Sequence, residues 1–582
     1  MDGTWSLDEL YLGFDDPKFS ADFADLGELC ARLKTLAGET LDSAALVTRY
    51  LTLSEELTDC AERLILYAEL RLSADTADMD AASWSGRVRE ALSATAGPDA
   101  ALRSRIAALE DLDALIGFDP LCGEYAYLLR NIRQDAKYLL SDGEEEVLSR
   151  MNLSGAGAWE NLHSQLTSSL AVDYDGGVTT LSSIRNLAYD PDPAVRKAAY
   201  EAELAAYPKI AEAGAFAMNS IKQQVLTECA LRGFDSPLER TLHGARMQRA
   251  TLDAMLEAIS DYLPKFRAYL RRKGTVLGHD NGLPWYDLFA PMGAGGRRYT
   301  VAEAREILLE LFGQFDESLQ TMTRRAFDER WIDFFPRPGK VGGAFCAGVA
   351  SIGQSRVLTN FDGSFSDVVT IAHELGHAYH GQQIYAHRSL NRDYSMPVAE
   401  TASTFNENLI MHAAITGERD PQVKLQLLES RLQDLNQIIV DILSRYTLET
   451  SVFEARPTQF LNAAALCEKM LAAQELSYGD GLDPELRHPY MWLCKGHYYS
   501  TLSFYNFPYA FGGLFAGGLY ALYRQEGKSF VARYQQLLRT TTVATVEDTA
   551  KVVGVDLKKR GFWEGALQTI SEEIDEFLAL TE

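Results

Sequence analysis

The chain has 582 residues, 47% of them hydrophobic, so it can bury a large core and is long enough for two or more domains. Its formal charge of -27 opposes phosphate neutralisation and argues against nucleic acid as a partner. Seven scattered cysteines without a CxxC pair, and an acidic N-terminus unlike a signal peptide, predict a reducing, cytoplasmic location.

Most of the chain is predicted to be amphipathic helix. Apolar residues recur at three- and four-residue spacing, which favours a mainly α protein. The pattern fills residues 43–70, 85–116, 144–170, 194–232, 248–277, 300–326, 422–450 and 560–580. The Asp-Pro-Asp-Pro break at 190–193 is the predicted boundary between an N-terminal helical region, 1–190, and a larger C-terminal domain, 191–582.

A strand followed by a helix is predicted after residue 354. The stretch "SRVLTNFD", 355–362, contains β-branched residues and ends at an Asp-Gly turn. Ser364 and Asp367 then form an S-x-x-D capping box. The helix is therefore expected to begin near 365 and to run through 380.

This helix carries an HExxH pattern. His373 and His377 are four residues apart, so they project from one face, where two neutral imidazoles can bind one Zn²⁺. Glu374 lies beside them and can take a proton from water without binding the metal. The pattern also arises by chance, and histidines on apolar helices are often ordinary buried residues. The uncharged flanking residues favour the zinc interpretation.

A catalytic zinc site needs a third protein ligand. His380 lies on the wrong turn of the same helix, so we expect it, like His387, to be a packing or surface residue. Glu400, at the start of the next predicted helix, is the predicted third ligand. Glu407 lies two turns further along the same face and is predicted to hydrogen-bond a ligand imidazole; the alternative is a plain solvated carboxylate.

One later segment has the length of a membrane span. Residues 496–523 contain no Asp, Glu, Lys or Arg, and Gly513 and Gly517 have GxxxG spacing. The first half is rich in polar groups that would lack partners in hydrocarbon, including His497 and Asn506. We therefore predict a buried, closely packed helix pair whose N-terminal half lines a wet surface, and no membrane association.

The paired pattern "HELGHAYH" and "ETASTFNE" resembles the oligoendopeptidase F branch of the thimet-oligopeptidase-like zinc metallopeptidases. The second half, ExxSxxxE, consists here of Glu400, Ser403 and Glu407. The resemblance extends to "GGAFC" at 342–346 and to the aromatic run "FYNFPYAFG" after His497, and it covers about residues 195–575.

The resemblance implies a mainly helical, two-lobed shell around a deep channel, with a small β-sheet beside the HExxH helix. Residues 191–582 would form the zinc metallopeptidase domain, with one Zn²⁺ per chain on the channel floor. Such enzymes cleave short peptides internally and exclude folded proteins. Short peptides are then the expected partners, and no obligate protein partner is evident.

The resemblance also implies an oxyanion-stabilising group formed by a histidine and tyrosines. His497, Tyr505 and Tyr509 match the family pattern, and these residues are the predicted donors. Phe507 departs from the pattern, because related enzymes often carry a tyrosine there. The identity of the donating tyrosine, Tyr498, Tyr505 or Tyr509, therefore stays open.

Substrate main chain is expected to add to the edge of the strand at 355–362, near the glycine-rich stretch 342–348. One alternative is a related exopeptidase, a carboxypeptidase or dipeptidyl carboxypeptidase, that holds a free carboxylate with an arginine near the site: Arg356, Arg388 or Arg392. Another is a peptide-binding protein with a structural zinc. The presence of the base Glu374 disfavours this last reading.

Overall fold

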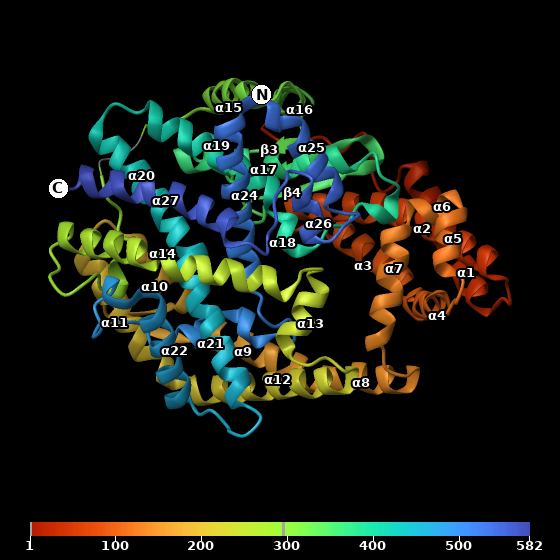
Figure 1. Cartoon of the computed structure of the whole chain (residues 1–582), viewed down its shortest axis with the longest axis horizontal. Helices are drawn as coiled ribbons and strands as arrows, with labels where there is room; N and C mark the ends of the chain where they lie inside the picture. Colours follow the sequence, from red (N-terminus) through yellow and green to blue (C-terminus); the bar gives the residue numbers. More distant parts are fainter. Residues whose placement is uncertain (1–2, 294–296) are drawn as a thin grey trace.

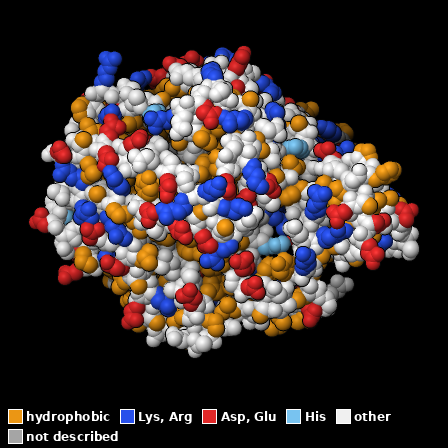
Figure 2. All heavy atoms as spheres, viewed as in Figure 1, with side chains coloured by type: hydrophobic (Ala, Val, Ile, Leu, Met, Phe, Trp, Pro, Cys, Tyr) orange, Lys and Arg blue, Asp and Glu red, His pale blue; other side chains and the backbone are white. Residues whose placement is uncertain are grey.

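The computed structural model describes residues 3–293 and 297–582. The described chain is mainly helical with small sheets, which confirms the predicted fold class. Figure 1 shows helices α1 to α7 (residues 17–135), in red and orange, gathered at one end of the molecule, with the later helices forming the larger part. Figure 2 shows acidic and basic side chains interspersed over one face, so the excess negative charge forms no single block there.

The helices before residue 245 are α1 (Pro17–Gly38), α2 (Ser43–Ala74), α3 (Met79–Ser93), α4 (Ala96–Ala107), α5 (Leu112–Phe118), α6 (Pro120–Glu124), α7 (Ala126–Asp135), α8 (Asp142–Ser154), α9 (Ala156–Ser168), α10 (Leu181–Asn186), α11 (Pro193–Ala206), α12 (Ala211–Arg232) and α13 (Pro237–Gly244). Proline at the start of α11 and an aspartate cap before it explain why the 190–193 break begins a helix.

The later helices are α14 (Arg249–Val276), α15 (Val301–Phe315), α16 (Glu317–Asp328), α17 (Phe365–Ile384), α18 (Met396–Ala399), α19 (Thr401–Gly417), α20 (Pro421–Asn436), α21 (Ile442–Ala455), α22 (Ala463–Tyr478), α23 (Met491–Cys494), α24 (Phe507–Glu526), α25 (Val531–Thr540), α26 (Val546–Lys551) and α27 (Arg560–Leu580). A π-helical turn, 437–441, joins α20 to α21.

The strands form two small sheets. β1 (Ala171–Tyr174) and β2 (Gly177–Thr180) make an antiparallel pair. In the second sheet the order is β3 (Ile332–Asp333), β5 (Gln354–Leu358) and β4 (Phe345–Val349), with β3 parallel and β4 antiparallel to β5. The predicted strand at 355–362 is therefore β5, but it is the central strand and has no free edge. The prediction that substrate adds to the edge of this strand is wrong, because β4 pairs along one side of β5 and β3 along the other.

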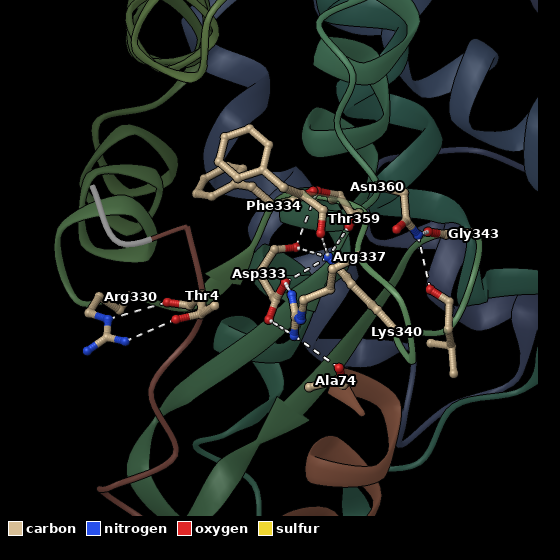
Figure 3. A network of polar contacts seen from close by, with 12 residues as sticks. Thr4, Ala74, Arg330, Asp333, Phe334, Arg337, Lys340, Gly343, Thr359 and Asn360 are labelled. Carbon is tan, nitrogen blue, oxygen red and sulfur yellow. Dashed lines mark hydrogen bonds and ion pairs between the residues drawn. The ribbon is translucent and has the colours of Figure 1, made fainter. Parts of the chain in front are cut away.

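A buried lysine fixes the loop that leads into β4 (Figure 3). The Lys340 side chain is 0% exposed, and its ammonium donates to the Asp333 carboxylate at 2.7 Å and to the carbonyl oxygen of Phe335 at 2.9 Å. Arg337 binds the same carboxylate and the carbonyl of Ala74 at the end of α2. This network joins the N-terminal helices to the sheet beside α17.

The described buried apolar residues form three large clusters. One lies within residues 10–132 and also includes Val349 on β4. A second joins 156–221 to 448–499, and the largest spans 225–577. The second cluster takes side chains from both sides of residue 190, and the domain boundary proposed there stays a prediction.

The uncharged segment 496–523 consists of a short 3-10 turn followed by the single helix α24, rather than the predicted helix pair. Within the described residues, no helix combines the length and the apolarity that crossing a membrane requires. The buried side of α24 packs in the largest apolar cluster, with Phe511 and Phe515 fully buried.

Candidate metal centre

Helix α17 begins as the sequence predicts. The Ser364 side chain accepts from the backbone N–H of Asp367, and the Asp367 carboxylate accepts from the backbone N–H of Ser364, which completes the capping box. The helix packs closely on α19 through Gly376: a Cβ there would lie 2.5 Å from the carbonyl oxygen of Ala402. Only glycine allows this approach, which brings the face carrying His373 and His377 close to α19.

Glu400 lies at the junction between α18 and α19, where it caps α19 instead of continuing a single helix from Pro397 as expected. Its Oε2 atom lies 3.3 Å from Nε2 of His373 and 3.3 Å from Nε2 of His377. The two Nε2 atoms are 3.2 Å apart. The predicted ligands therefore form a nearly equilateral triangle of donor atoms, the one such group of His, Cys, Asp and Glu found among the described residues.

Further hydrogen bonds orient two of these donors. Nδ1 of His373 donates to Glu407 at 2.6 Å, so the contact predicted for Glu407 is present. Because a carboxylate only accepts, Nδ1 carries a proton, and Nε2 is the ring nitrogen that would bind a metal ion after losing its own proton. The Ser403 hydroxyl donates to Oε2 of Glu400 at 2.7 Å. This arrangement gives a physical reason for the ExxSxxxE spacing.

The charges in the triangle complement one another. Burial alone would raise the pKa of Glu400, but hydrogen bonds from His373, His377 and Ser403 hold that pKa well below its usual range. Glu374 is 5% exposed and makes no such pair, and burial raises its pKa. A carboxyl with a raised pKa beside a metal-binding triangle suits proton transfer.

The two remaining histidines of this region lie elsewhere. His380 is fully buried, its Nε2 lies 2.8 Å from the hydroxyl of Thr541, and its ring stacks on Tyr394. Burial lowers the pKa of His380 to about 3, so it is a neutral packing residue. Nε2 of His387 is bonded to the carbonyl of Arg539 at the surface. Neither histidine belongs to the triangle.

Two cavities meet at the triangle. The larger, of about 1010 Å³, runs between α17, α19 and α20; the smaller, of about 540 Å³, lies along the edge strand β4. His373 and Glu374 line both cavities. The two cavities therefore adjoin at His373 and Glu374, beside the triangle.

The aromatic residues after His497 divide into two groups. Tyr509 is 42% exposed and lies in the first turn of α24. Three residues later, α24 comes close to Glu400: a Cβ added at Gly512 would lie 3.2 Å from Cβ of Glu400. The Tyr505 ring packs edge-on against Tyr509. Tyr498 is 1% exposed, which makes it a core residue. Tyr505 and Tyr509 are thus the two of the three candidate tyrosines that are not buried, and Tyr509 lies on the helix that approaches Glu400.

His497 lies among charged side chains. Burial, together with the charges of Arg445, Lys222 and Lys495, lowers the pKa of His497 to about 3. Its Nε2 atom is buried and has no hydrogen-bond partner in the described part of the chain. Among the described residues, no hydrogen bond or ion pair joins His497 to His373, His377 or Glu400, and the role predicted for His497 stays a prediction.

Each of the three arginines considered for carboxylate binding already has a carboxylate partner. Arg356 is fully buried and bonds Glu9 and backbone carbonyls, and Arg388 bonds Glu55. Arg392 pairs with Asp59 at 3.4 Å, donates to the carbonyl of His387 and lines the smaller cavity. Only Arg392 of these three lines a cavity at the site.

The loop at 500–506, here called the aromatic loop, joins the 3-10 turn to α24. The buried network that anchors this loop has no signature in the sequence. Lys222 donates to Glu449 at 2.7 Å, and both side chains are almost fully buried. The second Glu449 oxygen accepts from the amide of Asn506 at 2.9 Å, and Asn506 caps α24. Phe504, two residues earlier, has a φ of 55°, a strained value for a bulky residue. The loop before Tyr509 is therefore anchored at Asn506 and strained at Phe504.

Comparison with known proteins places this site in a family. The model for peptidase family M3 matches residues 186–569, and the model for oligopeptidase F matches residues 108–171. Oligopeptidase PepF of Bacillus subtilis is 23% identical over 98% of this chain and 86% of its own length. The group B oligopeptidase PepB of Streptococcus agalactiae is 22% identical over 98% of this chain and 96% of its own.

Solved structures have the same fold. A putative peptidase of Chlamydophila abortus superposes with a TM-score of 0.86 at 20% identity, covering 99% of this chain and 98% of that one. Oligoendopeptidase-F of Enterococcus faecium superposes with a TM-score of 0.71 at 19% identity, covering 97% of this chain and 98% of that one. Because the family match spans more than half of the sequence, the chain belongs to peptidase family M3 and is a metalloendopeptidase.

Proposed function

We propose that the chain is a zinc-dependent oligoendopeptidase that hydrolyses internal bonds of short peptides, with one Zn²⁺ held by His373, His377 and Glu400. The triangle of donor atoms, with edges of 3.2 to 3.3 Å, is the observation that carries the proposal. Tetrahedral zinc with nitrogen and oxygen ligands at about 2.0–2.2 Å has neighbouring donors about 3.3–3.6 Å apart. The residues present therefore fit the ion.

A zinc ion held by three protein ligands supplies Lewis-acid chemistry, favouring the ionisation of water and polarising a carbonyl oxygen. The chain supplies the proton transfers. The Glu374 carboxylate takes a proton from the attacking water and passes it to the nitrogen of the leaving amine. Burial of Glu374 supports this role, because a carboxyl with a raised pKa binds and releases a proton more readily near neutral pH.

Charge that develops on the scissile carbonyl oxygen needs donors placed in advance. We assign this role to Tyr509, with Tyr505 and His497 assisting. Burial and the neighbouring Tyr505 raise the pKa of Tyr509 to about 12, so its phenol stays protonated and able to donate. His497, with its pKa lowered to about 3, is neutral and keeps one ring N–H.

Substrate main chain is assigned to the edge of β4 rather than to β5. Ala344, Phe345, Cys346 and Gly348 line the smaller cavity with His377 and Glu374. An extended peptide bound there lies beside the reactive groups. Cavities on both sides of the triangle support internal cleavage, whereas an exopeptidase site is closed on one side. The cytoplasmic location stays part of this proposal, and so does a catalytic domain at 191–582.

Mass spectrometry of a digested peptide library tests the proposal. We expect internal cuts in short peptides, loss of cleavage with a zinc chelator, and recovery on adding Zn²⁺. Amidating the C-terminus of each peptide should leave cleavage unchanged, because an endopeptidase needs no free carboxylate. Cleavage that persists without metal would contradict the proposal, and so would a strict requirement for a free C-terminus, which would point to Arg392.

A further inference from the structure

The larger cavity contains a carboxylate that has no partner. Asp434, near the end of α20, lines this cavity together with Glu374 and Glu407. Across residues 3–293 and 297–582, no hydrogen bond or ion pair reaches the Asp434 carboxylate. The Asp434 side chain is exposed on the cavity wall, so its charge is open to a molecule that enters the cavity.

The cations that line the same cavity are already neutralised. Arg431 bonds Glu573 at 2.7 Å and the Asn408 side chain at 2.8 Å. Arg298 bonds Asp362 at 2.8 Å, and Arg297 pairs with Glu303. None of these arginines pairs with Asp434.

The other lining carboxylates have partners or another role. Glu407 accepts from His373, and Glu418 accepts from the backbone N–H groups of the two residues after it. Glu374 is reserved for proton transfer in the proposed mechanism. Among the described carboxylates that line this cavity, Asp434 is therefore the one that has neither a partner nor a catalytic role. Its negative charge stays unpaired in the cavity.

The surroundings of Asp434 favour a cation beside it. Desolvation by the cavity wall and the charge of Glu407 raise the pKa of Asp434 to about 6, with Arg431 acting in the opposite direction, while the side chain itself stays exposed. Asn408, 4% exposed, lines the same cavity and has an amide nitrogen without a hydrogen-bond partner in the described chain. A peptide in the cavity can bring a cation to the exposed carboxylate, whereas this amide nitrogen is enclosed in the cavity wall.

We propose that Asp434 determines specificity by binding a cationic group of the peptide substrate, either a Lys or Arg side chain or the free N-terminal ammonium. The proposal rests on the peptide-hydrolase function above and adds a preference that the metal site alone does not create. The cationic group occupies the larger cavity, so it lies on one fixed side of the scissile bond.

The test uses fluorogenic peptides in which a single Lys is moved through an otherwise neutral sequence, each made with a free and an acetylated N-terminus. The measured quantity is the ratio of kcat/KM for each charged peptide to that for its neutral parent. In the natural protein we expect this ratio to reach about 10 or more at one Lys position, or for the free N-terminus. In Asp434→Asn it should fall to about 1, because the cation loses its partner.

Two matched variants control for damage to the cavity. Asp434→Glu keeps the charge and should keep a ratio well above that of Asp434→Asn. Glu418→Gln removes a carboxylate from the same cavity and should keep the natural ratio. An unchanged ratio in Asp434→Asn, or no charge preference in the natural protein, overturns the proposal.

A binding measurement separates this proposal from the proposed function. Fluorescence anisotropy of the same labelled peptides is measured with Glu374→Gln and with Glu374→Gln/Asp434→Asn. Tighter binding of the charged peptide that disappears in the double variant supports Asp434 even if no peptide is cleaved. Absence of cleavage by the natural protein would contradict the proposed function alone, whereas equal binding by both variants would overturn the role of Asp434.

Discussion

The donor triangle and the aromatic loop, the two parts of the proposed site, differ in how their polar atoms are bonded. The triangle of His373, His377 and Glu400 is held by Glu407 and Ser403 before any metal or substrate arrives. In the loop region, the ring nitrogen Nε2 of His497 is buried without a partner in the described chain, and the backbone is strained at Phe504. The first part is preorganised by the protein, whereas we propose that the second becomes satisfied only when substrate is bound.

The largest effect is expected from Glu374→Gln. The amide cannot accept the proton of water, so kcat should fall by about 10²–10⁴. Zinc content should stay at one ion per chain, because Glu374 is not among the three donors. Metal analysis and kinetics of the same preparation check both statements. A Glu374→Gln protein with near-natural kcat would remove the proton-transfer assignment.

Tyr509→Phe should have the next largest effect. Loss of one donor to the developing oxyanion lowers kcat by about 10²–10³. KM and zinc content should change little, because the phenol acts on the transition state. Tyr505→Phe should lose less, and Tyr498→Phe should affect mainly thermal stability, because Tyr498 is 1% exposed. Steady-state kinetics of the three variants rank the tyrosines, and a larger loss for Tyr505→Phe would reassign the donor.

Glu407→Gln tests the preorganised part. The amide introduced at position 407 is a weaker acceptor for Nδ1–H of His373 than the Glu407 carboxylate, so the imidazole ring is oriented less firmly. Zinc affinity should therefore fall about 10–100-fold. Competition with a metal-binding dye measures this directly, and saturating zinc should restore most of the activity. If zinc affinity stays unchanged, Glu407 does not position the ligand.

Asn506→Ala tests the anchored end of the loop. It leaves one oxygen of the buried Glu449 without its partner, which should lower the free energy of unfolding by about 1–3 kcal/mol. Its effect on kcat should be smaller than that of Tyr509→Phe, and zinc affinity should not change. Chemical denaturation and zinc titration check both. A large loss of zinc would mean that the two parts of the site are coupled.

The contrast between the two parts also explains what could be predicted from sequence. His373, His377 and the Ser364 cap are local features of one helix, so spacing alone predicts their arrangement. Glu400 and Glu407 were found because their spacing follows a two-part motif, although Glu400 proved to be a helix cap. In each case a short stretch of chain determines the geometry.

Features that depend on distant parts of the chain could not be predicted. β5 was correctly expected as a strand, but its central place depends on β4 pairing along one side and on the two-residue β3 along the other. The isolation of Asp434 depends on Arg431 being engaged by Glu573 on another helix. The same reason applies to Asn506, whose partner Glu449 lies on α21 and is itself paired with Lys222 on α12.

Anomalous diffraction at the zinc absorption edge tests the central claim most directly. In crystals of the natural protein grown without chelator, the account predicts one strong peak bounded by Nε2 of His373, Nε2 of His377 and Oε2 of Glu400, and no peak there in His377→Ala. Absence of a peak at the triangle in zinc-replete natural protein, or a peak held by other residues, would contradict it.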